Sequence, residues 1–168
     1  MKSSILAILL LLTANTLIHA QHDVLLHGKD GLVIVNKQSK TIWHMPFGGI
    51  HDIHVLKNGN VMVQQNMSKV VEIDRKSMKI IWSYDSRAEG GNAGKRLEVH
   101  AFQPLENGNV MIAESGVGRI IEVNREGKIV KETKLVVDQS HPHRDTRLAR
   151  QLKNGNYLVA HEGDGKIR

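Results

Sequence analysis

Short apolar runs separated by polar turns recur along most of the chain. Val, Ile and Leu dominate runs such as NVMV, KVVEI and KIIWSY, which are only a few residues long. No long segment shows the 3.6-residue period of an amphipathic helix, so the pattern predicts short β-strands. We therefore expect an all-β protein.

Three of these runs carry the same Asn-Gly-Asn triplet. The copies read HVLKNGNVMV at 54–63, QPLENGNVMI at 103–112 and RQLKNGNYLV at 150–159. An Asn-Gly pair between apolar runs is a strong signal for a β-hairpin, and a type I′ turn needs positive φ at both central residues. Each copy is thus expected to form a tight type I′ hairpin.

The hairpin belongs to a longer repeat. Its first asparagines, Asn58, Asn107 and Asn154, lie 49 and 47 residues apart. Two further strands are predicted after each of the first two hairpins, at 70–74 and 80–84 and again at 120–124 and 129–133. Four short antiparallel strands in a repeat of this length are typical of a β-propeller blade. A β-sandwich of similar hairpins is the alternative, which the regular period disfavours.

The same strand pattern occurs once more near the start of the chain, as GLVIVNKQSKTIWHM, with Trp43 at the position of Trp82. Residues 24–46 therefore resemble a blade without its opening hairpin, and the last copy stops soon after its hairpin. We expect an incomplete ring of about three to three and a half blades, because propellers typically close with four to eight. The remaining blades would come from a longer chain or from other copies of this one.

The first twenty residues have the pattern of a secretory signal peptide. Lys2 is followed by an apolar run from Ile5 to Leu12 and by a small residue at Ala20. A retained membrane anchor is the alternative, but it would need about 18 or more apolar residues. We predict cleavage after Ala20, no membrane span thereafter, a propeller domain at 21–168, and a periplasmic or extracellular location.

Charge and composition narrow the choice of partner. The formal net charge is +6, but the basic residues are spread along the chain, which has only two Trp, two Tyr and two Phe. Nucleic-acid binding is therefore not expected, since it favours a basic stripe with stacking aromatics. A small anionic ligand, or a protein or glycan partner, suits the surface better. The chain has no cysteine, so it has no disulfide framework.

The triplets also locate candidate functional residues. Seven positions before the first asparagine stand His51, His100 and Arg147. The first strand of a blade is innermost, so these residues should gather at one mouth of the propeller, opposite the Asn-Gly turns. Imidazole can act as a base, nucleophile or metal ligand, and a guanidinium matches oxyanions. A site for an anion such as sulfate, a carboxylate or a quinone acid is one interpretation. The other is that these groups only satisfy backbone atoms.

Further candidates lie in the loops expected around the same mouth. Gln65, Glu114 and His161 follow the last asparagine of each triplet by five residues and are candidate ligand-binding residues. His141 and His143 are spaced to chelate zinc or copper, but the spacing fixes no third ligand, so no metal site is predicted from them.

Two stretches resemble known families. GGIHDIHVLKNGNVMV resembles a phrase of bacterial arylsulfotransferase-like propellers, and KVVEIDRKSMKIIWSY is similar to the repeats of PQQ-type quinoproteins. The first resemblance implies sulfuryl transfer, with His51 and His100 as acceptor or base and Arg147 as the stabiliser of the oxyanion. The second implies PQQ stacked beneath a tryptophan, usually with Ca²⁺, although no residue locates that group here.

The resemblance covers nearly all of residues 24–168, yet such repeats are shared by proteins of many functions. We therefore expect an exported propeller segment that binds a ligand or a partner and is non-catalytic as it stands. The alternatives are a partial arylsulfotransferase-like enzyme and a fragment of a PQQ-dependent quinoprotein.

Overall fold

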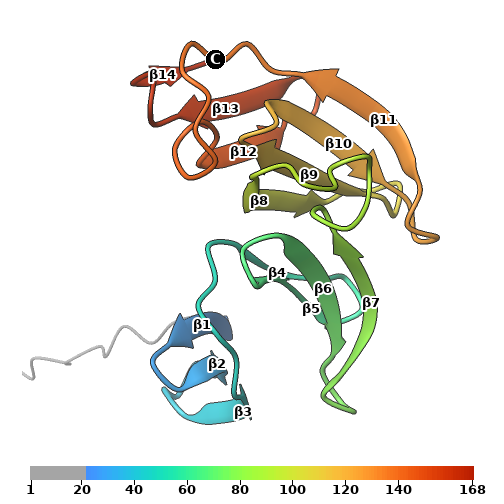
Figure 1. Ribbon diagram of the computed structural model, residues 1–168. Coiled ribbons are helices and arrows are strands. Elements are labelled where there is room, and N and C mark those ends of the chain that lie inside the picture. The colour runs from blue at the N-terminus through green and yellow to red at the C-terminus, as the bar shows by residue number, and fades with distance from the viewer. Residues whose placement is uncertain (1–21) are drawn as a thin grey trace, which may run out of the picture.

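The computed structural model describes residues 22–168, which form β-strands joined by turns and loops (Figure 1). The expected signal peptide at 1–20 lies outside the described residues. No helix long and apolar enough to cross a membrane occurs within the described range. The strands are β1 (Val24–Gly28), β2 (Gly31–Val35), β3 (Thr41–Met45), β4 (Ile53–Val55), β5 (Val61–Gln65), β6 (Lys69–Asp74), β7 (Lys79–Asp85), β8 (Glu98–Pro104), β9 (Val110–Ser115), β10 (Arg119–Val123), β11 (Ile129–Lys134), β12 (Leu148–Gln151), β13 (Tyr157–His161) and β14 (Lys166–Ile167).

The strands build four antiparallel sheets, which we number as blades 1 to 4. Their strand orders are β1-β2-β3, β4-β5-β6-β7, β8-β9-β10-β11 and β12-β13-β14. Each sheet is a simple meander, and the sheets follow one another around an arc that the described residues do not close (Figure 1). The prediction of an all-β, partial propeller is confirmed.

The four strands predicted after the first two hairpins are also confirmed, as β6, β7, β10 and β11. Blade 1 has three strands, and the match of Trp43 on β3 to Trp82 on β7 makes β1 the counterpart of β5. It therefore lacks a counterpart of β4 and with it the opening hairpin, as expected. The hairpin that it does have, between β1 and β2, turns at Gly28 and Gly31. Gly31 has φ 118°, and a Cβ there would lie 2.3 Å from the carbonyl oxygen of Met45. Only glycine fits this position.

The Asn-Gly turns are not of type I′. Gly59, Gly108 and Gly155 have φ of 84°, 86° and 84°, whereas the preceding asparagines are not among the residues with positive φ. In the first copy, Gly59 donates its N–H to the carbonyl of Leu56, and Leu56 donates to Asn60. This is the three-residue loop in which a type I turn is followed by a left-handed glycine.

The asparagine before each glycine explains why that loop is preferred. The side-chain oxygen of Asn58 accepts a hydrogen bond from the backbone N–H of Asn60 at 3.0 Å. Asn107 and Asn154 make the same bond to Asn109 and Asn156. This local bond holds a turn of the Asx type without requiring positive φ at the asparagine.

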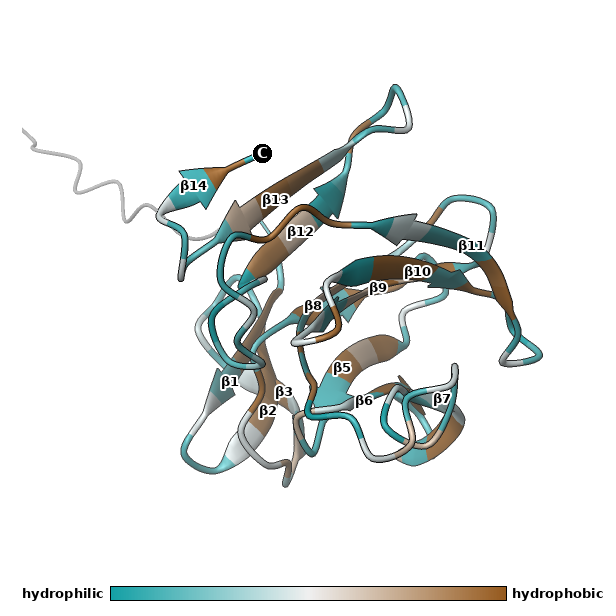
Figure 2. Ribbon diagram, turned by 45° about the horizontal axis from the view of Figure 1, so that its top comes forward, coloured by the Kyte–Doolittle hydropathy of each residue, from teal (hydrophilic) through white to brown (hydrophobic). Residues whose placement is uncertain are grey.

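The hydrophobic core lies between neighbouring blades, with one cluster at each of the three blade contacts. The cluster between blades 2 and 3 includes Tyr84 and Phe102, which are 1% and 0% exposed. The middle strands of the blades, such as β5 and β10, are the most hydrophobic (Figure 2). They are covered on both faces, which accounts for their nearly continuous apolar runs.

The two tryptophans tie successive blades together. Trp43 on β3 donates its indole N–H to the carbonyl of Arg75 in blade 2, at 3.0 Å. Trp82 on β7 makes the same bond to the carbonyl of Arg125 in blade 3, whose guanidinium also lies over the indole ring at 4.9 Å. Both indoles are partly buried and pack against core clusters. The expected packing role is therefore combined with a polar contact that repeats from blade to blade.

A carboxylate joins the inner strands of blades 2, 3 and 4. Asp52 stands just before β4 and is 8% exposed. It receives two hydrogen bonds from the guanidinium of Arg150 on β12, at 2.8 and 3.0 Å, and one from the backbone N–H of Phe102 on β8, at 3.2 Å. Burial alone would raise the pKa of Asp52, but hydrogen bonds from His54 and Arg150 outweigh it and hold the pKa below its ordinary value.

We expect Asp52→Asn to lower the free energy of unfolding by about 2 kcal/mol at pH 7, because a charged hydrogen-bond acceptor is lost. The folded-state pKa of Asp52 lies below the unfolded value of 3.8, so its contribution is present above about pH 4 and is lost as the pH falls through the folded pKa. The difference between the two proteins should therefore shrink on acidification. Chemical denaturation at several pH values measures it.

Glu106→Gln is the matched control for this substitution. Glu106 is an exposed carboxylate in the Asn-Gly turn of blade 3, and within residues 22–168 it makes no ion pair. Equal stability of the Asp52→Asn and Glu106→Gln proteins at pH 7 would contradict the role given to Asp52.

Candidate functional site

The three residues marked by the repeat spacing lie together. His51 precedes β4, His100 is on β8 and Arg147 precedes β12. The rings of His51 and His100 meet edge to face, with centroids 4.5 Å apart. Nη1 of Arg147 lies 3.2 Å from Nδ1 of His100. We call this region, where three successive blades begin their inner strands, the mouth. The convergence is observed, while the role of the residues is still a prediction.

His100 occupies a β-bulge. Val99 pairs with Glu114 and Ala101 with Ala113, so His100 is the extra residue of β8. Next to it, the backbone N–H of Val99 donates to the carbonyl of Met67 in blade 2. Bulges often occur beside functional sites, because they re-aim a side chain and end regular pairing. The imidazole of His100 is buried, with a side-chain exposure of 0%.

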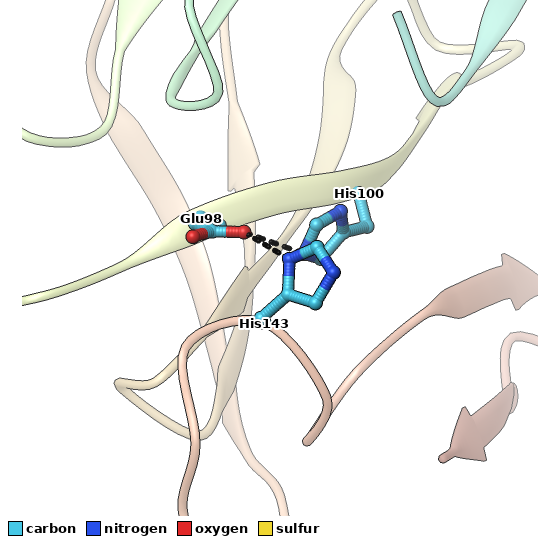
Figure 3. Close-up of side chains that lie close together, drawn as sticks. All are labelled: Glu98, His100 and His143. Carbon is cyan, nitrogen blue, oxygen red and sulfur yellow. Dashed lines mark hydrogen bonds and ion pairs between the residues drawn. The ribbon is translucent and has the colours of Figure 1, made fainter.

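Two residues outside the predicted trio complete the cluster (Figure 3). Glu98 is two positions before His100 on β8, and His143 comes from the loop that leads into β12. One carboxylate oxygen of Glu98 lies 3.0 Å from Nε2 of His100 and 2.8 Å from Nδ1 of His143. Glu98 was missed because no repeat position marks it. The two-residue spacing from His100 on a strand was the signal that could have found it.

Both histidines of the predicted trio have lowered pKa values. Burial, followed by the charge of Arg147 and the proximity of His51, lowers the pKa of His100 to about 4. Burial, then Arg147 and His143, likewise lowers the pKa of His51, against the opposing effect of Glu98. Both rings are therefore neutral near pH 7. A neutral His100 that donates from Nε2–H to Glu98 and accepts from Arg147 at Nδ1 satisfies all three groups, and this tautomer is assigned from the geometry.

Arg147 provides the cationic part of the mouth. Its Nε lies 3.1 Å from a carboxylate oxygen of Glu162, and its Nη1 also donates to the carbonyl of His143 at 3.3 Å. Within residues 22–168, no acceptor is hydrogen-bonded to Nη2. The side chain is 29% exposed. One edge of the guanidinium is thus open toward solvent at the mouth.

The other candidate residues do not join this cluster. Gln65 is half-buried at the end of β5. Glu114 is fully buried and pairs with Nε of Arg119 at 2.6 Å. His161 is 2% exposed, and its Nδ1 is bonded to the backbone carbonyl of Asp145. Glu114 and His161 therefore hold the fold together in this conformation, and their predicted part in ligand binding is not tested.

The two histidines of the HPH segment have different surroundings. His143 faces Glu98 and His100, as described above. His141 is exposed, and its Nδ1 accepts a hydrogen bond from the backbone N–H of His143 at 3.1 Å. The pair does not chelate as a unit. His143 instead meets partners that are distant in sequence.

The described residues do not form a PQQ site of the kind that the quinoprotein resemblance implies. Such a site needs a tryptophan that can stack on the cofactor, and the sequence has only two. Trp43 and Trp82 both lie on outer strands and donate to carbonyls of the adjacent blade. Neither indole is at the mouth.

Several solved propeller structures are similar to the described fold. A streptogramin B lyase matches with a TM-score of 0.58 and 12% identity, over 88% of this chain and 50% of that one. The WD40 propeller domain of Doa1 matches with a TM-score of 0.57 and 17% identity, over 82% and 42%. A protein of unknown function from Bacteroides caccae matches with a TM-score of 0.54 and 15% identity, over 85% and 50%. At these identities the likeness shows the fold alone, and this chain spans about half the length of these structures.

Comparison of the sequence with curated proteins gives no significant match. A family model does match, over residues 29–168, and it is described as outer membrane protein assembly factor BamB. That range includes every strand from β2 to β14 and the mouth. The chain belongs to this family of PQQ-like β-propeller repeat proteins.

Proposed function

We propose that the chain is part of a propeller-type binding module whose mouth holds a small ligand bearing an oxyanion. The observation that carries the proposal is the convergence of His51, His100 and Arg147 from three separate blades. Arg147 would bind the oxyanion through its open Nη2 edge, and the exposed ring of His51 would lie beside the ligand. Long connections between blades 2 and 3 and between blades 3 and 4 would surround it.

The charges near the mouth limit which ligands suit it. The imidazoles of His51 and His100 are neutral near pH 7, so Arg147 carries the positive charge that lies beside them. Glu162 and Glu98 lie close to it and offset its charge. A bare anion is therefore a poor match for the cluster. A ligand that combines an oxyanion with a hydrogen-bond donor or a cationic group would satisfy Arg147 and a carboxylate together.

The burial of His100 supports a binding role over the alternative of sulfuryl transfer. A histidine that accepts a sulfuryl group must reach the sulfur atom, and the side chain of His100 has no exposed surface. His51 is the exposed ring of the pair and would have to be the acceptor. The conditions for PQQ chemistry are less favourable still, since neither tryptophan is available for stacking.

Binding of a protein partner is a second candidate, and one feature on the other side of the blades favours it. A groove of about 550 Å³ lies between blades 2 and 3 beside their Asn-Gly turns. Apolar side chains of Val55, Leu56 and Leu105 line it together with Glu72 and Arg125. The family is described as an assembly factor of outer membrane proteins, which fits both a protein partner and the proposed export from the cytoplasm.

Titration with sulfate, phosphate and small zwitterionic carboxylates, at constant ionic strength and with a chelator present, tests the mouth as a binding site. We expect at least one of these probes to bind, and Arg147→Met to weaken its binding about tenfold or more, because charged hydrogen bonds to the oxyanion are lost. Calorimetry measures both constants.

Lys153→Met is the control, because Lys153 is an exposed cation at an Asn-Gly turn on the opposite side of the blade. It should leave binding unchanged. Failure of all the probes to bind, or equal losses in the Arg147→Met and Lys153→Met proteins, would exclude the mouth as an oxyanion site.

Sulfuryl transfer is tested with an aryl sulfate donor and a phenol acceptor. We expect no transfer above the rate without protein, because the buried ring of His100 cannot reach the donor. Release of the donor phenol is followed by absorbance. Transfer that the unmodified protein catalyses and His51→Ala abolishes would establish the enzyme alternative and overturn the non-catalytic proposal.

A further inference from the structure

We propose that Glu98, His100 and His143 form a binding site for a first-row transition-metal ion, of which Zn²⁺ is the representative. One ligand atom from each residue lies within 4.8 Å of the other two (Figure 3). Glu98 and His100 come from β8, and His143 comes from the loop before β12. The site therefore bridges blades 3 and 4 at the mouth.

The distances in this cluster fit a metal ion. Zinc bonds to imidazole nitrogen and carboxylate oxygen are about 2.0–2.2 Å long, so adjacent ligand atoms are about 3 Å apart at right angles and about 3.4 Å apart in a tetrahedron. The observed separations from the Glu98 oxygen are 3.0 Å to Nε2 of His100 and 2.8 Å to Nδ1 of His143. The two imidazole nitrogens lie within 4.8 Å of each other, so modest rotations of the side chains would seat an ion between the three atoms.

The chemistry of the three side chains selects among metals. Two imidazoles and one carboxylate are a donor set that zinc and other transition metals accept, with further coordination positions left for water or a ligand. Mg²⁺ and Ca²⁺ prefer all-oxygen surroundings and are poor matches. A metal binds imidazole through an unprotonated ring nitrogen, and Nε2 of the buried His100 ring already faces the Glu98 carboxylate at 3.0 Å.

A divalent ion at this cluster would also change the charge of the mouth. Near the mouth the carboxylates of Glu98 and Glu162 offset the positive charges of Arg147 and of Arg87, which acts on Glu98. A divalent ion would add two positive charges to this cluster, and would thereby turn a mouth that is poorly suited to bare anions into one that attracts them.

The loop that carries His143 is fixed in place. The carboxylate of Asp145 accepts hydrogen bonds from the hydroxyl of Ser115 and from the backbone N–H of Gly116 in blade 3. Gly116 is packed so closely that a Cβ there would lie 2.9 Å from Pro142, next to His143 in sequence. These contacts set the loop against β9 before any ion binds, which lowers the entropic cost of ordering His143.

Metal binding would change the partner of Arg147. To offer Nε2 to a metal, His100 must carry its proton on Nδ1, where it now accepts a hydrogen bond from Nη1 of Arg147. Two N–H groups would then face each other, so Arg147 would leave His100 and present both Nη groups to the mouth. Metal and oxyanion should therefore strengthen each other's binding by the same factor. This coupling rests on the proposed function, whereas the metal site does not.

Calorimetric titration of the chelator-treated, untagged protein with ZnCl₂ tests the site. We expect one Zn²⁺ per chain, no binding of Mg²⁺ under the same conditions, and an affinity more than about 100-fold lower in His143→Ala, because loss of a ligand costs more than loss of an outer-shell partner. His143 is exposed, so this variant should fold. Glu98→Gln should weaken binding in the same direction.

His44→Ala is the control, because His44 is an exposed histidine on β3 of blade 1. It should bind Zn²⁺ as the unmodified protein does. Co²⁺ in place of Zn²⁺ should give visible d–d bands that His143→Ala removes. Absence of stoichiometric Zn²⁺ binding, or equal affinity in the unmodified, His143→Ala and Glu98→Gln proteins, would overturn the proposal.

The same titrations separate this inference from the proposed function. Oxyanion binding without Zn²⁺ binding would remove the metal site and leave the binding module. Zn²⁺ binding to the three residues, with no oxyanion bound in its presence or absence, would retain the metal site and remove the oxyanion function. Tighter oxyanion binding with Zn²⁺ present, lost in Arg147→Met, is the result expected if both hold.

Discussion

The buried carboxylate of Asp52 needs hydrogen-bond donors, and it finds them on strands that are far away in sequence. Arg150 on β12 supplies two, and the backbone of Phe102 on β8 supplies a third. Because a buried charge without partners is costly, these bonds fix the inner strands of blades 2, 3 and 4 relative to one another. His51 is the residue before Asp52, and Arg147 is three residues before Arg150. The contact that fixes the blades therefore also fixes the residues of the mouth.

The repeat made much of the architecture predictable, since each triplet marks one hairpin and sets the register of the strands that follow. The residues seven positions before the triplets, His51, His100 and Arg147, were predicted from this spacing alone to lie together. The turn type was not predictable from the Asn-Gly pair alone. The same Asn-Gly sequence also fits a different turn. In that turn the asparagine side chain accepts a hydrogen bond from the backbone N–H two residues later, and only the glycine has a left-handed conformation.

The partners of His100 were harder to infer, because tertiary contacts select them. Glu98 lies on the same strand, but a bulge at His100 breaks the regular alternation that sequence reasoning uses. His143 reaches the cluster from a loop whose path depends on Asp145 and Gly116 in the neighbouring blade. The HPH spacing drew attention to two histidines, and only the tertiary structure shows that one joins the site while the other contacts the backbone.

The mouth is less positively charged than the residue types His51, His100 and Arg147 suggest for an anion-binding site. Burial keeps His100 neutral, and Glu98 and Glu162 balance Arg147, so the cluster resembles a set of metal ligands beside a guanidinium more than an anion site alone.

The central claim is that side chains from three repeats meet at one mouth. NOE spectroscopy of the metal-free protein, with histidine resonances assigned by substitution, tests it most directly. Ring-to-ring cross-peaks between His51 and His100 and between His100 and His143 are predicted, since their ring centroids are 4.5 and 5.1 Å apart. Well-resolved ring signals without either cross-peak would contradict the account.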